Sequence, residues 1–390
     1  MDNEMQADYI IIGAGIAGAS IAYWLAPHAR VIILERESQP GYHSTGRSAA
    51  LYMESYGPPQ VRAMTCASRA FFDHPPPGFA GHPLLIPRGA LMFATQDQLA
   101  ELDKHEAIVR SVSDKVERPD AEQACRRVPV LRRELVAAAV YEADAADIDV
   151  HALHQGFLRG AKAGAAGAKL ICDAAVLALA YRTQTWEITT TQGRFSAPVV
   201  INAAGAWADV IGQMAGAAHI GLAPMRRSAF TFQPPAGMDV SSWPLFMRID
   251  ESFYVKPDAG MLLGSPANVD PVAPHDVQAE ELDIAIAIDH IQNLTTLHVR
   301  RPSHVWAGLR SFVADGSLVA GFDQQLAGFF WAAGQGGYGI QSAPAAGEAY
   351  AAMLRGLPIP DHILAHGVDA AALSPARLSG KDGDGGSSGI

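Results

Sequence analysis

Residues 9–25 read YIIIGAGIAGASIAYWL, and this stretch decides the fold. Its apolar start, residues 9–12, predicts a strand that is buried on both faces of a parallel sheet. Residues 16–25 then predict a helix, and the apolar run VIIL at residues 31–34 predicts a second buried strand. A strand, a helix and a strand in this order are the unit from which a parallel α/β sheet is built.

The turn between the first strand and the helix is rich in glycine. Gly13 permits a tight turn, Gly15 lets the backbone approach a phosphate, and Gly18 allows the helix to pack closely on the strand. Glu35 follows the second strand, where an acid accepts a hydrogen bond from a ribose hydroxyl and disfavours a 2′-phosphate. The motif therefore predicts that a dinucleotide binds with its pyrophosphate at the helix N-terminus.

Composition limits the class of protein further. The chain has 390 residues, 49% of them hydrophobic, and a formal net charge of −11. This length predicts two domains, and the negative charge opposes a nucleic-acid partner. No apolar run reaches the roughly 18 residues that a membrane span needs, although peripheral association with a membrane is left open. Three scattered cysteines without metal-type spacing predict a cytoplasmic protein that holds no metal.

The order of predicted elements indicates an α/β protein with two domains of different architecture. A Rossmann-like domain is expected to form from three separated pieces of chain, residues 1–56, 150–225 and 311–375. The intervening pieces carry strands typical of a mixed or antiparallel sheet and are expected to form a substrate domain, residues 57–149 and 226–310. The last residues, 376–390, are rich in Gly and Ser and predict a flexible tail.

The segment after the second strand favours FAD over NAD. Residues 43–50 read HSTGRSAA and place hydroxyls, an arginine and exposed amides beside the predicted ribose site. Glycine-bearing strand ends return later, at residues 202–207 (NAAGAW) and 334–339 (GQGGYG). FAD is a long ligand that needs such an extended cradle. Read alone, residues 43–50 are equally consistent with a polar helix cap.

In this order, the motifs resemble those of the D-amino-acid oxidase/glycine oxidase superfamily of FAD oxidoreductases. The resemblance covers nearly the whole chain apart from its C-terminal tail. Within the superfamily, residues 41–50, 250–268 and 306–316 are most similar to the bacterial D-arginine dehydrogenases.

The resemblance implies that the cofactor is FAD, and the lack of a Cys after Cys172 favours a non-covalent cofactor. The resemblance implies contacts between the cofactor and the glycine turn, the loop after the second strand, three later segments and the helix that follows residue 338. The implied contacts are Gly13, Gly15, Ile16, Ala17, Gly18, Glu35, Arg36, Ser44, Thr45, Gly46, Arg47, Ser48, Ala49, Ala50, Val176, Ala204, Gly205, Trp207, Arg310, Gly336, Gly337, Tyr338, Gly339, Ile340 and Gln341.

The resemblance also implies oxidative deamination of a D-amino acid, in which a hydride passes from Cα to flavin N5 and an imino acid is produced. A guanidinium binds a carboxylate through two parallel hydrogen bonds, which makes Arg310 and Arg227 the candidates for holding the substrate. Arg226 is the alternative to Arg227 if the strand register differs by one residue. The resemblance adds four further residues to the substrate cavity, Tyr56, Tyr254, Gly337 and Gln341.

The expected side-chain pocket departs from that of the D-arginine dehydrogenases. Ala90 stands where those enzymes carry a Glu that pairs with the substrate guanidinium. Leu51 and Met53 replace a His and a Thr, and Leu245 and Met247 lie near the substrate side chain. Loss of a charge-assisted pair costs ~2–4 kcal/mol in a partly buried site. We therefore expect apolar side chains to be preferred over cationic ones.

The electron acceptor is expected to be a quinone or another carrier. Sarcosine-oxidase-like relatives use a Lys to activate dioxygen, and Leu262 stands at that position here. Those relatives bind flavin through a Cys, and no Cys follows Cys172. Lys256 shares a strand face with Tyr254 and is an alternative to the missing Lys.

Three other functions are open at this stage. A flavin amine oxidase would act on N-methyl or cyclic imino acids with dioxygen as acceptor. A 2-hydroxy-acid dehydrogenase would need a base near Arg310, which the sequence does not reveal. A nucleotide sensor would bind the cofactor without turnover. Either a side chain or water can deprotonate the substrate amine.

Overall fold

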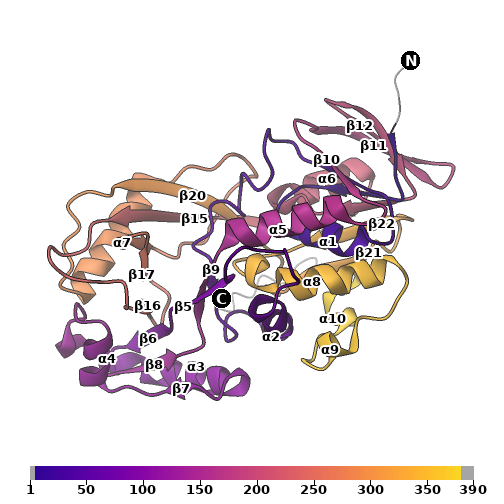
Figure 1. Cartoon of the computed structure of the whole chain (residues 1–390). Helices are drawn as coiled ribbons and strands as arrows, with labels where there is room; N and C mark the ends of the chain where they lie inside the picture. The colour runs from indigo at the N-terminus through magenta and orange to yellow at the C-terminus, as the bar shows by residue number, and fades with distance from the viewer. Residues whose placement is uncertain (1–4, 379–390) are drawn as a thin grey trace.

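The computed structural model describes residues 5–378 and shows two lobes (Figure 1). One lobe contains a parallel sheet flanked by α1 (Ile16–Leu25), α5 (Val150–Ala163) and α8 (Gly339–Leu354). The other is built on long strands beside α7 (Glu281–Leu294). This arrangement confirms the expected fold class, a Rossmann-like nucleotide-binding fold joined to a mixed sheet.

Segments far apart in the sequence form the sheet of the first lobe. In spatial order its strands are β10 (Ala168–Ile171), β3 (Val31–Leu34), β2 (Tyr9–Ile12), β14 (Val199–Asn202), β22 (Phe329–Ala333) and β21 (Val319–Phe322). Neighbouring strands are parallel except for the last pair, β22 and β21, which are antiparallel. The carboxyl ends of β2, β3 and β14 therefore meet at one edge of the sheet.

Both faces of this sheet are covered, which explains the unbroken apolar runs. Ile11 and Ile33 lie in a core with residues of α1 and α8. Ile10 and Ile12 point to the opposite face and pack with Trp186 of a smaller sheet. The strands of that sheet are β1 (Met5–Gln6), β13 (Gly193–Ala197), β12 (Thr185–Thr190) and β11 (Val176–Arg182).

The second lobe carries the mixed sheet. Its strands are β19 (Asp270–Pro271), β15 (Ala223–Phe232), β18 (Met261–Ser265), β17 (Tyr254–Asp258), β16 (Leu245–Arg248), β6 (Ala90–Ala94), β8 (Ala138–Glu142) and β7 (Val116–Glu117), with β20 (His304–Phe312) beside β15. Only the β16–β6 pair of these described strands is parallel.

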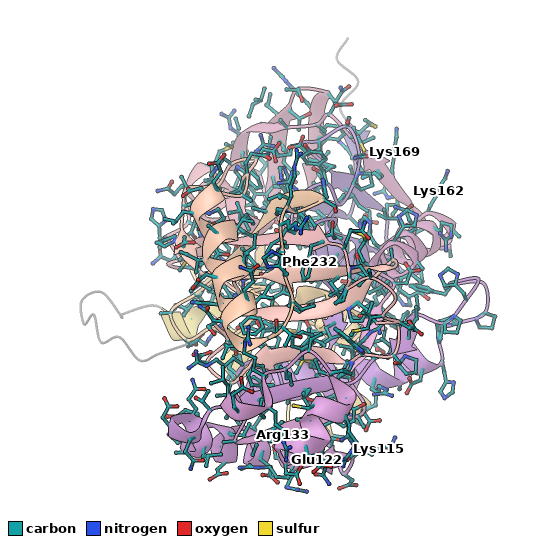
Figure 2. The ribbon with its side chains drawn as sticks, turned by 90° about the vertical axis from the view of Figure 1, so that its left-hand side faces the viewer. Lys115, Glu122, Arg133, Lys162, Lys169 and Phe232 are labelled. Atoms are coloured by element: carbon teal, nitrogen blue, oxygen red, sulfur yellow. The ribbon has the colours of Figure 1, made fainter. Side chains whose placement is uncertain are left out.

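Alternation along these strands separates a core from a cavity wall. Phe246 of β16 and Leu91 of β6 pack in a core with residues of α7. Figure 2 shows Phe232, another member of that core, among the strands of the sheet. Met247 and Met92 belong to the opposite face and to a separate cluster. Period-two alternation therefore aims one apolar set at the first lobe.

The remaining elements complete the lobes. Around the mixed sheet lie α3 (Leu99–Val112) and α4 (Ala121–Arg127). A small sheet between the lobes contains β4 (Leu51–Tyr52), β9 (Ala146–Ile148) and β5 (Leu85–Pro87). Among the described helices, none has the length and apolar character that a membrane crossing requires.

Helix α2 and residues 376–378 pack differently from what the expected domain boundaries imply. Helix α2 (Pro59–Asp73) falls in the piece expected in the substrate domain, yet Val61 and Met64 share the core of α1 and α8. Residues 376–378 were expected in a flexible tail, but they form part of a 3₁₀ turn in which Arg377 pairs with Asp315 at 2.8 Å. Residues 379–390, the rest of that tail, lie outside the described residues. The other boundaries stay predictions.

Candidate active site

Two cavities adjoin at strand β20. Leu309 and Ser311 line the smaller cavity, whose volume is about 310 Å³. Arg310, between them, lines the larger cavity of about 930 Å³. Likewise, Gly336 lines the smaller cavity and Gly337 lines the larger one. Because alternate residues of a strand face opposite sides, a single strand serves both cavities, and one long ligand can extend along it.

The glycine turn forms one wall of the smaller cavity. A Cβ on Gly13, whose φ is +104°, would lie 2.4 Å from the carbonyl oxygen of Ala203. A Cβ on Gly18 would lie 2.0 Å from the oxygen of Gly13, so Gly18 serves helix packing and does not line the cavity. Nε2 of buried His154 donates a hydrogen bond to the main-chain oxygen of Ala14 at 2.9 Å. Only glycine therefore fits this close approach of strand, turn and helix.

Glu35 and Thr45 hold the turn in place. Glu35 is buried, and its Oε2 accepts a hydrogen bond from the amide of Ala14 at 2.9 Å. Thr45 Oγ1 accepts from the amide of Ile16, at the start of α1, at 3.0 Å. The amides of Gly15 and Ala17 have no acceptor among residues 5–378. Free amides at a helix N-terminus are the groups that bind a phosphate.

The other predicted cofactor residues fall into three sets. Those lining the smaller cavity are Gly13, Gly15, Ile16, Ala17, Glu35, Arg36, Ser44, Thr45, Val176, Ala204, Gly205, Trp207 and Gly336. Those lining the larger cavity are Ser48, Ala49, Ala50, Arg310, Gly337, Tyr338, Ile340 and Gln341. Those lining neither are Gly18, Gly46, Arg47 and Gly339.

The side chain of Arg47 contacts other segments of the protein. Its Nη2 pairs with Asp276 at 2.5 Å, and its Nη1 donates to the oxygen of Ala307 at 3.2 Å. These two bonds hold the loop that carries Arg47 against β20 and against the segment that contains Asp276. Arg36, by contrast, lies over the ring of Trp207 at 4.7 Å, on the wall of the smaller cavity.

Gln335 is among the residues of the smaller cavity that the sequence analysis missed. Gln335 lines the smaller cavity, and its Nε2 is buried without a hydrogen-bond partner in the described structure. A buried amide donor without a partner is costly unless a ligand accepts from it. Together with the glycine turn, this donor fits a dinucleotide that runs from the smaller cavity into the larger one. Its position in the Gly-rich segment 334–339 was the available signal.

Two arginines lie on the wall of the larger cavity. In the antiparallel pairing of β15 and β20, Arg227 is opposite Gly308, and Arg310 is opposite Met225. The two arginines are thus diagonal neighbours on one face. Arg226 points to the other face and pairs with Asp283 at 2.9 Å, which excludes it from the cavity. The register therefore selects Arg227.

The charges of the two arginines make this part of the cavity wall suitable for binding an anion. Burial and the neighbouring Arg227 lower the pKa of Arg310 from its ordinary value. Burial also opposes the charge of Arg227, but Tyr56, Tyr254 and Glu251 outweigh it and raise the pKa of Arg227. Among the described residues, no carboxylate forms an ion pair with either guanidinium. A substrate carboxylate would supply the missing negative charge.

Tyrosines and Gln341 border the arginines. Tyr56 and Tyr254 line the cavity as expected, and burial raises the pKa of Tyr56. Gln341 lines it too, but its Oε1 accepts from the amide of Met53 at 3.1 Å and its Nε2 donates to Thr65 at 3.0 Å. Gln341 therefore ties α8 to the segment that carries Met53.

Another part of the larger cavity's wall is apolar. The expected residues Leu51, Met53, Leu245 and Met247 line it, joined by Met92. Ala90 does not line the cavity: it is 2% exposed and is buried in the same cluster as Met53, Met92, Leu245 and Met247. Met92 was missed, although period-two alternation from Ala90 predicts that both residues share a face.

Other lining residues were also missed because nothing near them in the sequence marks them. Glu251, with φ of +55°, and His105 are two titratable examples. Loss of hydration raises the pKa of Glu251 from its ordinary value, and its side chain lines the cavity. Burial lowers the pKa of His105 to about 4, so this imidazole is neutral at pH 7.

Leu262 stands where relatives carry the lysine that activates dioxygen, and Lys256 is the alternative. Neither residue lines a cavity. Leu262 is fully buried in the core beneath α7. Lys256 is 4% exposed, donates to Asp147 at 2.7 Å, and lines neither cavity. Lys256 is thus held by an ion pair away from the site.

The chain is similar to a known protein family and to known proteins. A family model described as FAD dependent oxidoreductase matches residues 8–353. The FAD-dependent oxidoreductase domain-containing protein 1 of Bos taurus is 24% identical over 408 residues, which cover 90% of this chain and 81% of that protein.

Solved structures give the same picture. Glycine oxidase from Geobacillus kaustophilus superposes with a TM-score of 0.82 at 22% identity, covering 96% of this chain and 99% of that one. Iminodiacetate oxidase from Chelativorans sp. BNC1 superposes with a TM-score of 0.77 at 25% identity, covering 90% and 96%. The resemblance to the superfamily is confirmed, whereas the closer likeness to D-arginine dehydrogenases stays a prediction.

Proposed function

This chain belongs to the FAD dependent oxidoreductase family, with FAD as its cofactor, and from that premise we propose that it oxidises D-amino acids to imino acids. One observation carries the proposal. Two arginines that form no ion pair with a carboxylate of residues 5–378, Arg227 and Arg310, face a cavity that adjoins the dinucleotide cavity at β20. That arrangement fits a substrate with a carboxylate next to its reacting carbon.

The residues of the larger cavity perform three tasks. Arg310 and Arg227 bind the carboxylate by paired charge-assisted hydrogen bonds, with Tyr56 and Tyr254 beside them. The apolar wall receives the side chain and excludes water from it. Holding both ends of the substrate fixes the direction of its Cα–H bond. FAD, when bound, takes up the hydride that leaves this carbon.

The preference for apolar side chains follows from the apolar part of the cavity wall. Met92 and Met247 are unbranched and adaptable, so the wall can accommodate side chains of different shape. Buried apolar area contributes ~25 cal/mol per Å², so discrimination among apolar substrates should be shallow.

We propose further that FAD is held non-covalently and that the enzyme is a dehydrogenase that passes its electrons to a quinone or another carrier. The three cysteines lie outside the lining of both cavities, which supports a non-covalent cofactor. The burial of Leu262 and the ion pair of Lys256 support the absence of a lysine that activates dioxygen.

One comparison favours a second candidate. Iminodiacetate is a secondary amine with two carboxylates, and the oxidase named for it is 25% identical to this chain. An oxidase acting on N-methyl or cyclic imino acids with dioxygen would use the same two arginines for its carboxylates. It would differ in the size of the group attached to nitrogen and in the acceptor.

Anaerobic mixing tests both candidates. The purified FAD-loaded protein is mixed with D- and L-enantiomers of leucine, methionine, phenylalanine and arginine, and with sarcosine, proline and iminodiacetate. We expect D-amino acids to bleach the flavin absorbance within seconds and L-enantiomers to leave it unchanged. Bleaching by sarcosine, proline or iminodiacetate alone, followed by peroxide formation in air, would establish the second candidate instead.

A further inference from the structure

Arg227 lies on β15 beside a gap in the sheet. On one side of β15, strand β18 pairs with it as far as Phe230 opposite Gly264. The chain then turns away, with Ala267 at φ of +52°, and pairs with β15 again only where Asp270 is opposite Arg226. The backbone of β15 therefore lacks a regular partner between these two pairings.

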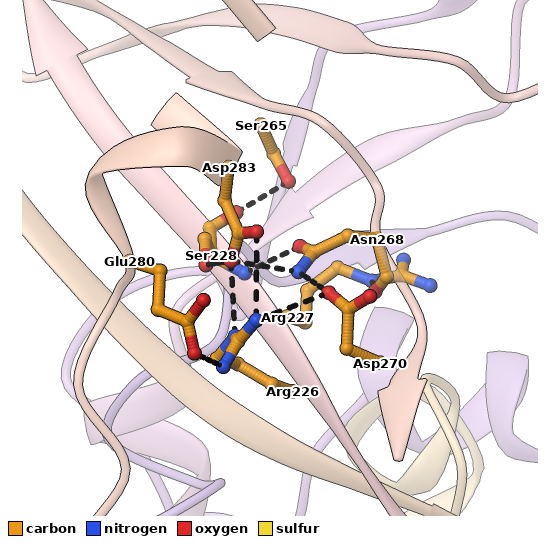
Figure 3. Close-up of polar contacts among 8 residues, drawn as sticks. All are labelled: Arg226, Arg227, Ser228, Ser265, Asn268, Asp270, Glu280 and Asp283. Atoms are coloured by element: carbon orange, nitrogen blue, oxygen red, sulfur yellow. Dashed lines mark hydrogen bonds and ion pairs between the residues drawn. The ribbon is translucent and has the colours of Figure 1, made fainter. Parts of the chain in front are cut away.

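Asn268 fills this gap. Its side-chain Oδ1 accepts a hydrogen bond from the amide of Ser228 at 2.8 Å. Its main-chain oxygen accepts from Nε of Arg227 at 3.0 Å. Asn268 thus substitutes for a strand on one side and contacts the substrate-facing guanidinium on the other, as Figure 3 shows.

Asn268 is itself held by a buried acid on the far face of β15. Its Nδ2 donates to Oδ2 of Asp283 at 3.0 Å, and Asp283 is 8% exposed. The same Oδ2 accepts from Nε of Arg226 at 2.9 Å and from the hydroxyl of Ser228 at 2.7 Å (Figure 3). A charged network beneath the sheet is therefore joined to Arg227 through one asparagine.

We propose that Asn268 is a positioning residue that orients the guanidinium of Arg227, and that Asp283 holds Asn268 for this task. The inference rests on the proposed function, because it takes Arg227 as a carboxylate ligand. With Nε donating to Asn268, rotation of the guanidinium is restricted and its two Nη groups remain for the cavity. Those two groups bind a carboxylate through parallel hydrogen bonds, and orienting them beforehand removes an entropic cost of binding.

A purely structural role for Asn268 predicts something different. If Asn268 only closed the gap in the sheet, its removal would lower stability and affect binding whether or not Arg227 is present. If it acts through Arg227, its effect on binding disappears once Arg227 has been replaced. A double-mutant cycle separates the two roles.

The experiment measures a carboxylate probe and turnover in parallel. Binding of 4-methylpentanoate, the deaminated analogue of leucine, is followed by calorimetry on FAD-loaded wild type, Asn268→Ala, Arg227→Met and the double variant. We expect Asn268→Ala to raise the Kd roughly tenfold and to raise the KM for D-Leu similarly, while kcat changes by less than about threefold. In the Arg227→Met background, Asn268→Ala should cause no further change.

Controls make each outcome decisive. FAD content and Tm are measured first, and Asp283→Asn replaces Asn268→Ala if the latter does not fold; the same direction is expected. Glu280→Gln is the matched control, since Glu280 contacts Arg226 of the same network but is 59% exposed at its side chain. It should leave the Kd unchanged. Equal losses from Asn268→Ala in both backgrounds would overturn the inference alone. Failure of Arg227→Met to weaken binding would overturn the carboxylate site of the proposed function as well.

Discussion

Glu142 lies directly opposite Ala90 across the antiparallel pair of β8 and β6. Its side chain is 2% exposed and accepts hydrogen bonds from the hydroxyl of Ser55 at 2.5 Å and from the amide of Glu54 at 3.1 Å. No cation among the described residues forms an ion pair with it. A buried acid therefore lies on the strand next to position 90, where the D-arginine dehydrogenases carry a Glu and this chain has Ala.

Introducing an acid at position 90 should therefore require a change at Glu142. Side chains directly opposite each other in an antiparallel pair have Cβ atoms about 4.5–5.5 Å apart, so Ala90→Glu would place two carboxylates together in a buried cluster. We expect Ala90→Glu to lower Tm at pH 8 and to gain little activity on D-Arg. Ala90→Glu with Glu142→Gln should recover Tm and show the larger gain. Equal Tm values for the two variants would contradict this account.

Glu142 should also make stability depend on pH. Burial raises its pKa to about 7, against an ordinary value of 4.5. The folded chain thus binds more protons than the unfolded chain between those pH values, so stability decreases as pH rises from about 4.5 to about 7 and then levels off. Glu142→Gln should flatten the Tm profile across this range. An unchanged slope in the variant would assign the effect to other groups.

Arg310→Met tests the carboxylate site. We expect the variant to retain FAD and to lose about three orders of magnitude in kcat/KM for D-Leu, since truncating one partner of a desolvated charge pair costs about 3–5 kcal/mol. Arg301→Met, an exposed arginine, is the matched control. Activity of Arg310→Met within tenfold of wild type would remove this residue from the site.

Gly13→Ala tests the dinucleotide turn. The added methyl would meet the oxygen of Ala203 at 2.4 Å, a backbone atom that cannot move without disturbing β14. We expect a colourless protein, or one with FAD content reduced at least about tenfold, because the turn and the free amides beside it would shift. Gly78→Ala has a similar positive φ of +81° with open space around its Cβ and should bind FAD normally. Full FAD occupancy in Gly13→Ala would refute the assignment.

Substrate preference tests the apolar wall. We expect D-Leu, D-Met or D-Phe to exceed D-Arg in kcat/KM by about tenfold or more, since a cation there would lie among Met92, Leu245 and Met247. Steady-state assays with an artificial electron acceptor measure this ratio. A clear preference for D-Arg would instead identify an acid, such as Glu251 or Glu54, as its partner.

Much of the nucleotide site could be predicted because its determinants are local. Gly13, Gly18 and Glu35 belong to one strand–helix–strand unit, and parallel pairing of β2 with β3 brings Glu35 to the turn without any long-range choice. Arg47 and Gly46, which line neither cavity, lie in the following loop, and no local pattern encodes the contacts of that loop with β20 and with residues 276–277.

The substrate site depended on sheet register instead. The sequence favoured Arg227 and left Arg226 as its alternative, and the pairing of β15 with β20 assigned Arg226 to a buried ion-pair network and Arg227 to the cavity. The sequence alone determined the family-type fold, the dinucleotide turn and a candidate pair of arginines, because short-range spacing and apolar periodicity specify these features. Only the tertiary structure set Glu142 against Ala90 and Asn268 against Arg227, because a one-residue shift of register moves every side chain of a strand to its other face.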